Sequence, residues 1–192
     1  MRHTPQIKKA IQFAARKHRK QYRAESEPLP YITHLFSVAL LVAEDGADEE
    51  VVIAALLHDT LEDTDTMLTE LSENFGERVS SLVHTVSEPV AEDGTELPWR
   101  ERKEKYLEQI ALGEDEALVI AIADKIDNID SKLEAYAVEG AALFDRWGQT
   151  PENYKWYHGE VLALAQKRLS NHPLTRRLAE EFERERDMLS GI

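Results

Sequence analysis

The sequence of 192 residues contains no cysteine. This absence excludes a disulfide framework, a thiolate zinc site and a cysteine nucleophile. Because disulfides belong to oxidising compartments, a chain without cysteine also fits a reducing one, and we expect a cytoplasmic location. The sequence also has no run of about 18 uncharged apolar residues, so we expect no segment that spans a membrane.

Positive charge is scarce. Lys and Arg number 23 against 37 Asp and Glu, which gives a formal net charge of −14. A broad basic face that could displace counterions is therefore not expected, which argues against duplex nucleic acid as a partner. A small anionic ligand remains compatible if a bound cation and a few local bases offset the overall field. Nothing in the sequence specifies an oligomeric state.

Strand-like alternation of apolar and polar residues is also missing, and no internal repeat is present. Apolar residues make up 42% of the chain, which favours a folded protein. Glycine, proline and capping residues divide the chain into successive helical segments. After a first helix that ends before residue 23, these are expected at about 31–44, 51–63, 67–76, 77–86, 98–113, 115–140, 151–170 and 174–189. We therefore expect an all-α fold with a single domain over residues 1–192.

The first 24 residues contain several Lys and Arg but no acid, a composition shared with transit peptides. A folded helix explains them better. Thr4 can cap its N-terminus and Pro5 suits its first position. The apolar residues also form one stripe at helical spacing. They are Ile7, Ala10, Ile11, Ala14 and Ala15.

One segment, residues 51–57, is apolar on every side of a helix and leads directly into polar residues. Such a segment is typical of a buried central helix. The polar residues that follow are His58, Asp59, Glu62 and Asp63. At about 100° per residue they occupy a wedge of about 140°, so we expect them to converge on one side. Three carboxylates and an imidazole packed together are costly unless a cation or several donors compensate.

Two more apolar segments deliver single polar residues. Asp124 follows residues 117–123, which are apolar all round, and Asn128 lies one turn further on the same face. In the segment from residue 31, His34 stands among apolar neighbours with no local partner. Imidazole and carboxylate ligands together suit manganese, iron, zinc or a similar first-row ion. We therefore expect a divalent metal.

Each of these residues has a plainer interpretation when taken alone. His34 could be a core histidine with a satisfied hydrogen bond, and Asp124 could be the ion-pair partner of Lys125 or Lys132. Glu62 and Asp63 could be a solvated helix end. Their combination at the ends of three apolar segments is what favours a metal site.

The ordered set His34, His58-Asp59 and Asp124 is similar to the metal-binding signature of the HD-domain phosphohydrolases, which are helical throughout. Within that superfamily, residues 57–64 resemble the HDxxEDT box of the RelA/SpoT-type alarmone hydrolases. Further matching segments are residues 30–34 (PYITH), 74–76 (NFG) and 122–128 (IADKIDN). The resemblance covers about residues 7–165, with a charged helix at 174–189 beyond it. A stand-alone hydrolase domain is thus expected.

The resemblance implies a role for each matching residue. His34, His58, Asp59 and Asp124 would bind one metal ion, manganese in most of these hydrolases. Glu62 and Asp63 would lie beside the attacking water and handle protons. The residues implied in substrate binding are Arg23, Asn128 and, by a looser match, Tyr154.

The resemblance implies hydrolysis of a phosphorylated nucleotide, with a guanosine 3′-pyrophosphate as the leading substrate. Ala24 and Glu88 stand where such hydrolases usually carry bases, so another nucleotide such as NADPH or a nucleoside mono- or triphosphate is the alternative. A nucleotide sensor without catalysis is a second alternative, although it would not need Glu62 and Asp63. A structural role for the charged helices at 98–112 and 174–189 is the third, but their mixed charges are more typical of solvated faces.

Overall fold

The computed structural model describes residues 3–23, 29–90, 94–95, 97–140 and 148–190. Throughout these ranges the regular structure is α-helical, and the one β-bridge joins Tyr22 to Pro30. The expected all-α fold is confirmed. The helices are α1 (Pro5–Lys17), α2 (Ile32–Glu44), α3 (Glu49–Leu57), α4 (Thr60–Asp63), α5 (Leu68–Phe75), α6 (Glu77–Val86), α7 (Trp99–Leu112), α8 (Asp115–Glu139), α10 (Pro151–Arg168) and α11 (Pro173–Ser190). In this part of the chain, no helix has the length and apolar character needed to cross a membrane.

Helix α1 begins where the sequence predicts. The Thr4 hydroxyl accepts a hydrogen bond from the Ile7 amide at 3.2 Å, and Pro5 occupies the first turn. The buried face differs slightly from the predicted stripe, because Phe13 is buried while Ala15 is exposed. Phe13 packs edge-on against Phe75 of α5, with ring centroids 5.4 Å apart. This contact joins α1 to α5, which lies more than 50 residues further along the chain.

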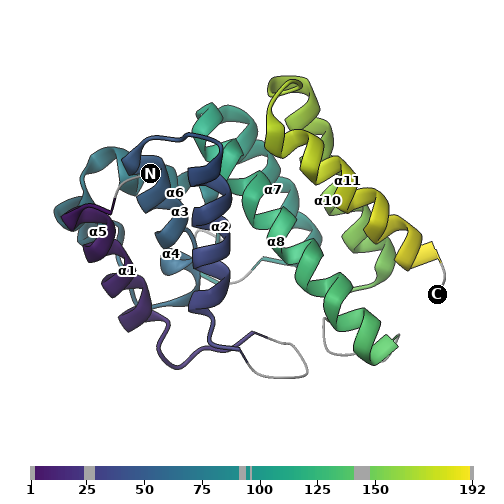
Figure 1. Ribbon diagram of the computed structural model, residues 1–192, viewed down its shortest axis with the longest axis horizontal. Helices are drawn as coiled ribbons and strands as arrows, with labels where there is room; N and C mark the ends of the chain where they lie inside the picture. Colours follow the sequence, from purple (N-terminus) through teal and green to yellow (C-terminus); the bar gives the residue numbers. More distant parts are fainter. Residues whose placement is uncertain (1–2, 24–28, 91–93, 96, 141–147, 191–192) are drawn as a thin grey trace.

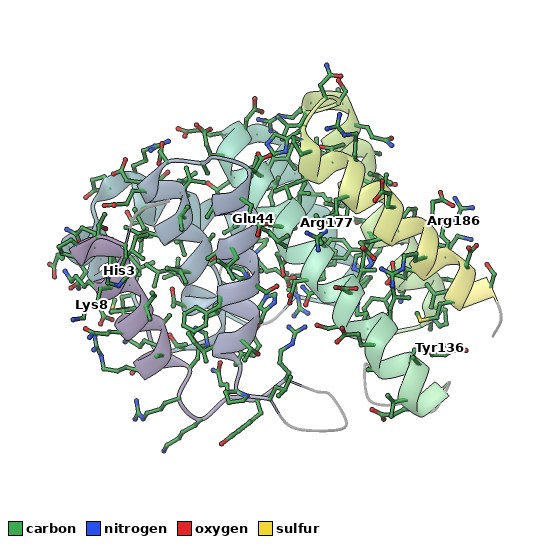
Figure 2. All side chains as sticks on the ribbon, viewed as in Figure 1. His3, Lys8, Glu44, Tyr136, Arg177 and Arg186 are labelled. Carbon is green, nitrogen blue, oxygen red and sulfur yellow. The ribbon has the colours of Figure 1, made fainter. Side chains whose placement is uncertain are left out.

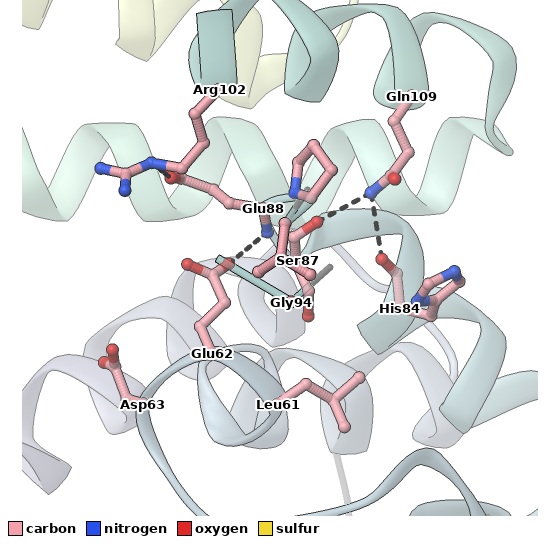
Figure 3. Close-up of a pocket in the computed structure, with 11 residues that line it drawn as sticks. Leu61, Glu62, Asp63, His84, Ser87, Glu88, Gly94, Arg102 and Gln109 are labelled. Atoms are coloured by element: carbon pink, nitrogen blue, oxygen red, sulfur yellow. Dashed lines mark hydrogen bonds and ion pairs between the residues drawn. The ribbon is translucent and has the colours of Figure 1, made fainter. Parts of the chain in front are cut away.

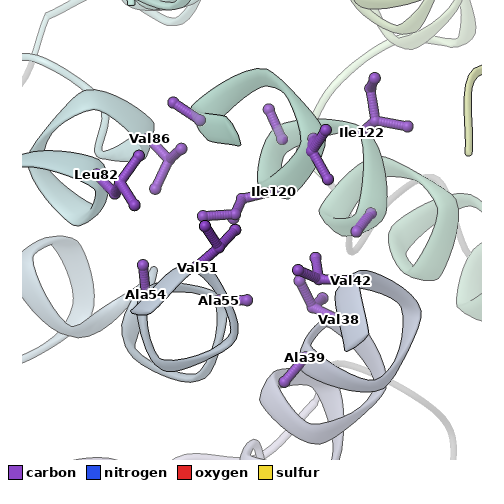
Figure 4. Close-up of a cluster of buried hydrophobic side chains, with 14 of the residues drawn as sticks. Val38, Ala39, Val42, Val51, Ala54, Ala55, Leu82, Val86, Ile120 and Ile122 are labelled. Atoms are coloured by element: carbon purple, nitrogen blue, oxygen red, sulfur yellow. The ribbon is translucent and has the colours of Figure 1, made fainter. Parts of the chain in front are cut away.

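Helix α3 is the centre of one half of the molecule. All of its residues from Val51 to Leu57 are buried, as expected for a helix that is apolar all round. It packs against α1, α2, α6 and α8 (Figure 1). Figure 4 shows Val51 in one cluster of buried side chains with Ile120 of α8 and with Val38 and Val42 of α2. The polar residues that follow α3 therefore lie at the edge of a dry core.

Helix α8 joins this half to the other, formed by α7, α10 and α11 (Figure 1). Its first half, residues 117–126, is buried. The charged C-terminal helix α11 buries one stripe against α8 and α10, including Leu178 and Phe182. Figure 2 shows Arg177 and Arg186 projecting outward from α11, and both are exposed. The expected solvated face of this helix is thus present.

The helix through the His58-Asp59 pair is not continuous, contrary to the sequence expectation. Helix α3 ends at Leu57, a turn follows, and α4 starts at Thr60. The Thr60 hydroxyl donates to the Leu57 carbonyl at 2.6 Å, and this side-chain bond competes with the regular helical pattern. Both residues of the pair keep right-handed helical dihedrals, so their side chains still leave on the side that the sequence predicts.

Candidate active site

Four side chains from three places in the fold meet at one point. His34 comes from α2, His58 and Asp59 from the turn between α3 and α4, and Asp124 from α8. The His34 Nε2 atom lies 3.3 Å from His58 Nε2, 3.2 Å from Asp124 Oδ1 and 3.5 Å from Asp59 Oδ2. The His58 Nε2 atom lies 3.1 Å from Asp59 Oδ2 and 3.8 Å from Asp124 Oδ1. The structure therefore brings together the four ligand-type residues that the sequence singled out.

The hydrogen bonds of the two Nδ1 atoms determine whether the Nε2 atoms of His34 and His58 carry a proton or a free lone pair. His58 Nδ1 lies 2.8 Å from the Ala55 carbonyl oxygen, which can only accept, so Nδ1 carries the proton. His34 Nδ1 lies 2.6 Å from Asp127 Oδ2 and donates in the same way. In the neutral rings both Nε2 atoms then present lone pairs to each other and to two carboxylates. His34, His58 and Asp59 offer ligand atoms within 4.8 Å of one another, and Asp124 Oδ1 lies 3.2 Å and 3.8 Å from the two Nε2 atoms. Nitrogen and oxygen acceptors that converge in this way suit a divalent transition metal.

The same acceptors also attract protons. Burial acts to lower the pKa of His58, but the Asp59 and Asp124 carboxylates outweigh it and raise that pKa well above the usual range. The same holds for His34: burial acts to lower its pKa, but the contacts with Asp124 and Asp127 outweigh burial and raise it. Burial opposes ionisation of Asp59 too, yet the neighbouring His58 lowers its pKa. A divalent ion would take the place of these protons, and its binding would release them.

An outer layer of contacts fixes the orientation of the cluster. The Tyr31 hydroxyl donates to Asp59 Oδ2 at 2.7 Å. Lys125 Nζ and Asn128 Nδ2 each approach one oxygen of Asp124 at 2.5 Å. Such contacts hold metal ligands in one geometry and tune their basicity. Asp127, the partner of His34, is not predicted from the sequence, although it stands inside the matched segment at residues 122–128.

Glu62 and Asp63 lie on α4, one turn beyond the cluster, and their side chains are accessible to solvent. The loss of hydration in the cleft, together with the charges of Asp59 and Glu88, raises the pKa of Glu62 to about 8. The loss of hydration and the charge of Asp59 also raise the pKa of Asp63 to about 6. Carboxyl groups at a simple solvated helix end would keep their ordinary pKa values. The surroundings therefore give Glu62 and Asp63 pKa values that differ from those of solvated carboxyl groups and from each other.

Two cavities meet at these acids. One of about 210 Å³ is lined by His34, Asp59 and Asp124 of the cluster and also by Lys103, Tyr106, Lys125 and Asn128. The second, of about 790 Å³, lies between α4, the end of α6 and α7 (Figure 3). Glu62, Asp63 and Glu88 line both, and Figure 3 shows Glu62 bonded to the Glu88 backbone, whose amide is 2.7 Å from Glu62 Oε1.

The predicted substrate-binding residues lie at different distances from the cluster. Asn128 lines the smaller cavity, and Arg23 Nη1 donates to Asn128 Oδ1 at 3.3 Å while its Nη2 lies 3.6 Å from Asp127. Tyr154 is not among the described residues that line either cavity. Its ring instead packs on Lys132, whose Nζ is 3.7 Å from the ring centroid. Ala24 lies outside the described residues.

Comparisons with known proteins agree with this geometry. A family model described as "HD domain" matches residues 10–144. A guanosine-3′,5′-bis(diphosphate) 3′-pyrophosphohydrolase of Aquifex aeolicus is 45% identical over 129 residues, 66% of this chain but only 18% of that protein. The Homo sapiens protein of that name, designated MESH1, is 43% identical over 65% of this chain and 68% of its own length. A solved structure described as a metazoan ortholog of SpoT that hydrolyses ppGpp superposes with a TM-score of 0.78 and 29% identity, covering 98% of this chain and 99% of that one. The chain therefore belongs to the HD-domain family.

Proposed function

We propose that this protein is a metal-dependent phosphohydrolase that removes pyrophosphate from the 3′ position of guanosine 3′,5′-bis(diphosphate) and of the related 5′-triphosphate. The observation that carries the proposal is the cluster of four converging acceptors beside two carboxyl groups with raised pKa values. The names of the relatives from Aquifex aeolicus and Homo sapiens support this substrate. We place the activity in the cytoplasm, in keeping with the absence of cysteine.

We assign the ion to His34, His58, Asp59 and Asp124, and propose manganese because two imidazoles and two carboxylates suit it. When bound, such a divalent cation polarises a phosphoryl oxygen and lowers the pKa of a coordinated water. Asp127, Tyr31 and Asn128 hold the ligands in position from outside. The rest of the chemistry falls to groups of the chain itself.

Glu62 and Asp63 are assigned opposite roles in proton transfer. At pH 7 a carboxyl group with a pKa near 8 keeps its proton, whereas one with a pKa near 6 is mainly ionised. Asp63 then accepts a proton from the attacking water, and Glu62 donates one to the ribose 3′ oxygen as its bond to phosphorus breaks. The products are a guanosine 5′-diphosphate and pyrophosphate. A bound cation would lower both pKa values, and the proposal requires that Glu62 stays the weaker acid of the two.

Substrate recognition is assigned to Asn128 and Arg23. Asn128 lines the cavity that holds the cluster, and Arg23 contacts it from the segment before α2. Arg23 supplies a guanidinium that can form bidentate hydrogen bonds with phosphate oxygens. Tyr154 stays a prediction with weaker support, because its described contacts are with α8, α7 and α10.

The experiment is an activity screen with purified protein supplied with manganese. Guanosine 3′,5′-bis(diphosphate), NADPH, nucleoside monophosphates and nucleoside triphosphates are incubated separately, and products are resolved by anion-exchange chromatography. The proposal expects guanosine 5′-diphosphate and pyrophosphate from the first compound, and loss of both products with a chelator. Cleavage of simple monophosphates with the tetraphosphate left intact would refute the substrate but keep the phosphohydrolase. No cleavage of any compound would refute the activity.

A further inference from the structure

Glu88 lies at the boundary between the two cavities. It follows α6 directly after Ser87, and it lines both the cavity of about 210 Å³ that holds the cluster and the neighbouring one of about 790 Å³. Figure 3 shows its side chain directed toward Arg102 of α7. A ligand that extends from the cluster into the larger cavity must therefore pass this carboxylate.

The Glu88 carboxylate contacts two bases of α7. Its Oε2 lies 2.5 Å from Arg102 Nε, and its Oε1 forms an ion pair with Lys103 Nζ. The side chain of Glu88 is 15% exposed, that of Arg102 19% and that of Lys103 13%. Water therefore screens these contacts less than it screens surface ion pairs. Glu88 thus neutralises bases that border the route to the cluster.

Phosphate would compete for the same donors. Guanidinium and ammonium groups bind phosphate oxygens through the contacts that they make with a carboxylate. The other lysine that lines the smaller cavity, Lys125, already contacts Asp124, and that cavity also contains Asp59, Glu62 and Asp63. A phosphorylated ligand entering this acidic surrounding is repelled by Glu88 and has to displace it to reach Lys103. The cost grows with the number of phosphate charges on the ligand.

We propose that Glu88 is a specificity-determining residue, an internal anion that occupies the phosphate-binding donors of Arg102 and Lys103 and weakens binding most for the most highly phosphorylated nucleotides. The substrate part of this inference rests on the proposed function. Glu62 is held by the backbone amide of Glu88 and not by its side chain. The Glu88 charge does act on Glu62 at a distance, so its removal moves the falling limb of the turnover profile to lower pH. At the pH optimum of each variant, the loss of the charge is expected to appear mainly in the Michaelis constant.

The test compares Glu88→Gln with the wild type and with Glu101→Gln. Glu101 lies on α7 and pairs with the exposed Lys105, so this control removes one negative charge away from the cavities. With each protein measured at its own pH optimum, we expect Glu88→Gln to lower the Michaelis constant for guanosine 3′,5′-bis(diphosphate) about tenfold and to change the turnover number by less than about twofold. A second variant, Glu88→Asp, keeps the charge but shortens its reach, and an intermediate Michaelis constant is expected. Circular dichroism checks that each variant is folded.

A binding measurement separates this inference from the proposed function. Inorganic phosphate is titrated calorimetrically into each protein, because pyrophosphate would strip the metal. Tighter phosphate binding by Glu88→Gln, and not by Glu101→Gln, supports the inference even if no variant cleaves the guanosine nucleotide. Equal binding by all variants, or binding undetectable in all, overturns it, even if the wild type cleaves that nucleotide as proposed.

Discussion

The pH dependence of turnover depends on Glu62 and Asp63. The ordinary pKa values of these residue types, 4.5 for Glu and 3.8 for Asp, would leave both ionised at neutral pH. With values of about 8 and about 6, roughly nine in ten Glu62 groups are protonated at pH 7 and roughly nine in ten Asp63 groups are ionised. The shift in Glu62 alone raises the protonated fraction about 300-fold over an unperturbed glutamate. At neutral pH the cleft therefore holds Glu62 as a protonated acid and Asp63 as an ionised base.

The turnover number should follow a bell-shaped pH profile. It rises as Asp63 loses its proton and falls as Glu62 loses its own; because turnover requires the bound cation, both limbs are expected below the values of about 6 and about 8 that the protein alone sets. Glu62→Gln should abolish the falling limb, Asp63→Asn the rising limb, and each should cost about 10² to 10⁴ in turnover while metal content stays at the wild-type level. The assay is steady-state hydrolysis across pH 5–10, with Glu70→Gln of α5 as the control. Wild-type rates and an unchanged profile in both variants would show that α4 ends in two solvated carboxylates without a catalytic role.

Three further predictions address binding, metal affinity and packing. Arg23→Ala should raise the Michaelis constant more than it lowers the turnover number, because Arg23 is proposed to bind substrate and transition state equally; the reverse pattern in steady-state kinetics would contradict this. Asp127→Asn should weaken manganese binding by about 10- to 100-fold in a competition titration, since the amide orients His34 less well than the carboxylate; an unchanged affinity would remove Asp127 from the site. Ile120→Ala should lower the free energy of unfolding by about 2–5 kcal/mol in urea, because Ile120 is fully buried; a loss under about 1 kcal/mol would mean a looser core than the structure has.

The sequence predicts helices well where capping and periodicity agree. Thr4 and Pro5 mark the start of α1, and the apolar stretch at residues 51–57 becomes the buried helix α3. It does not predict the turn at His58-Asp59, because that turn depends on a hydroxyl–carbonyl bond between Thr60 and Leu57 that competes with helix formation. Local residue preferences alone favour a continuous helix there.

The candidate site divides in the same way. Apolar segments that end in polar residues predict that His34, His58, Asp59 and Asp124 converge, since each emerges from a helix of the core. Partners far apart in the sequence are not predictable from local pattern. The contact of His34 with Asp127, 93 positions away, depends on how α2 packs on α8. The packing of α10 likewise places Tyr154 on Lys132.

Glu88 illustrates a difference that only the structure reveals. From the sequence it is a position where a base is expected and an acid occurs. In the fold, the same side chain pairs with Arg102 and Lys103, which lie 14 and 15 positions further along the chain. An acid at position 88 therefore removes the positive charge expected there and also neutralises those of Arg102 and Lys103. This arrangement changes the expected substrate preference more than the sequence comparison alone indicates.

On our proposal, the cluster of two imidazoles and two carboxylates holds a divalent cation. The most direct test of this proposal is the metal content of protein purified from manganese-supplemented medium, measured by plasma mass spectrometry for the wild type, His58→Ala and the exposed-histidine control His3→Ala. We predict about one transition-metal ion per chain in the wild type and in His3→Ala, and none in His58→Ala. A wild type without metal, or a His58→Ala variant that retains its full complement, would contradict the account.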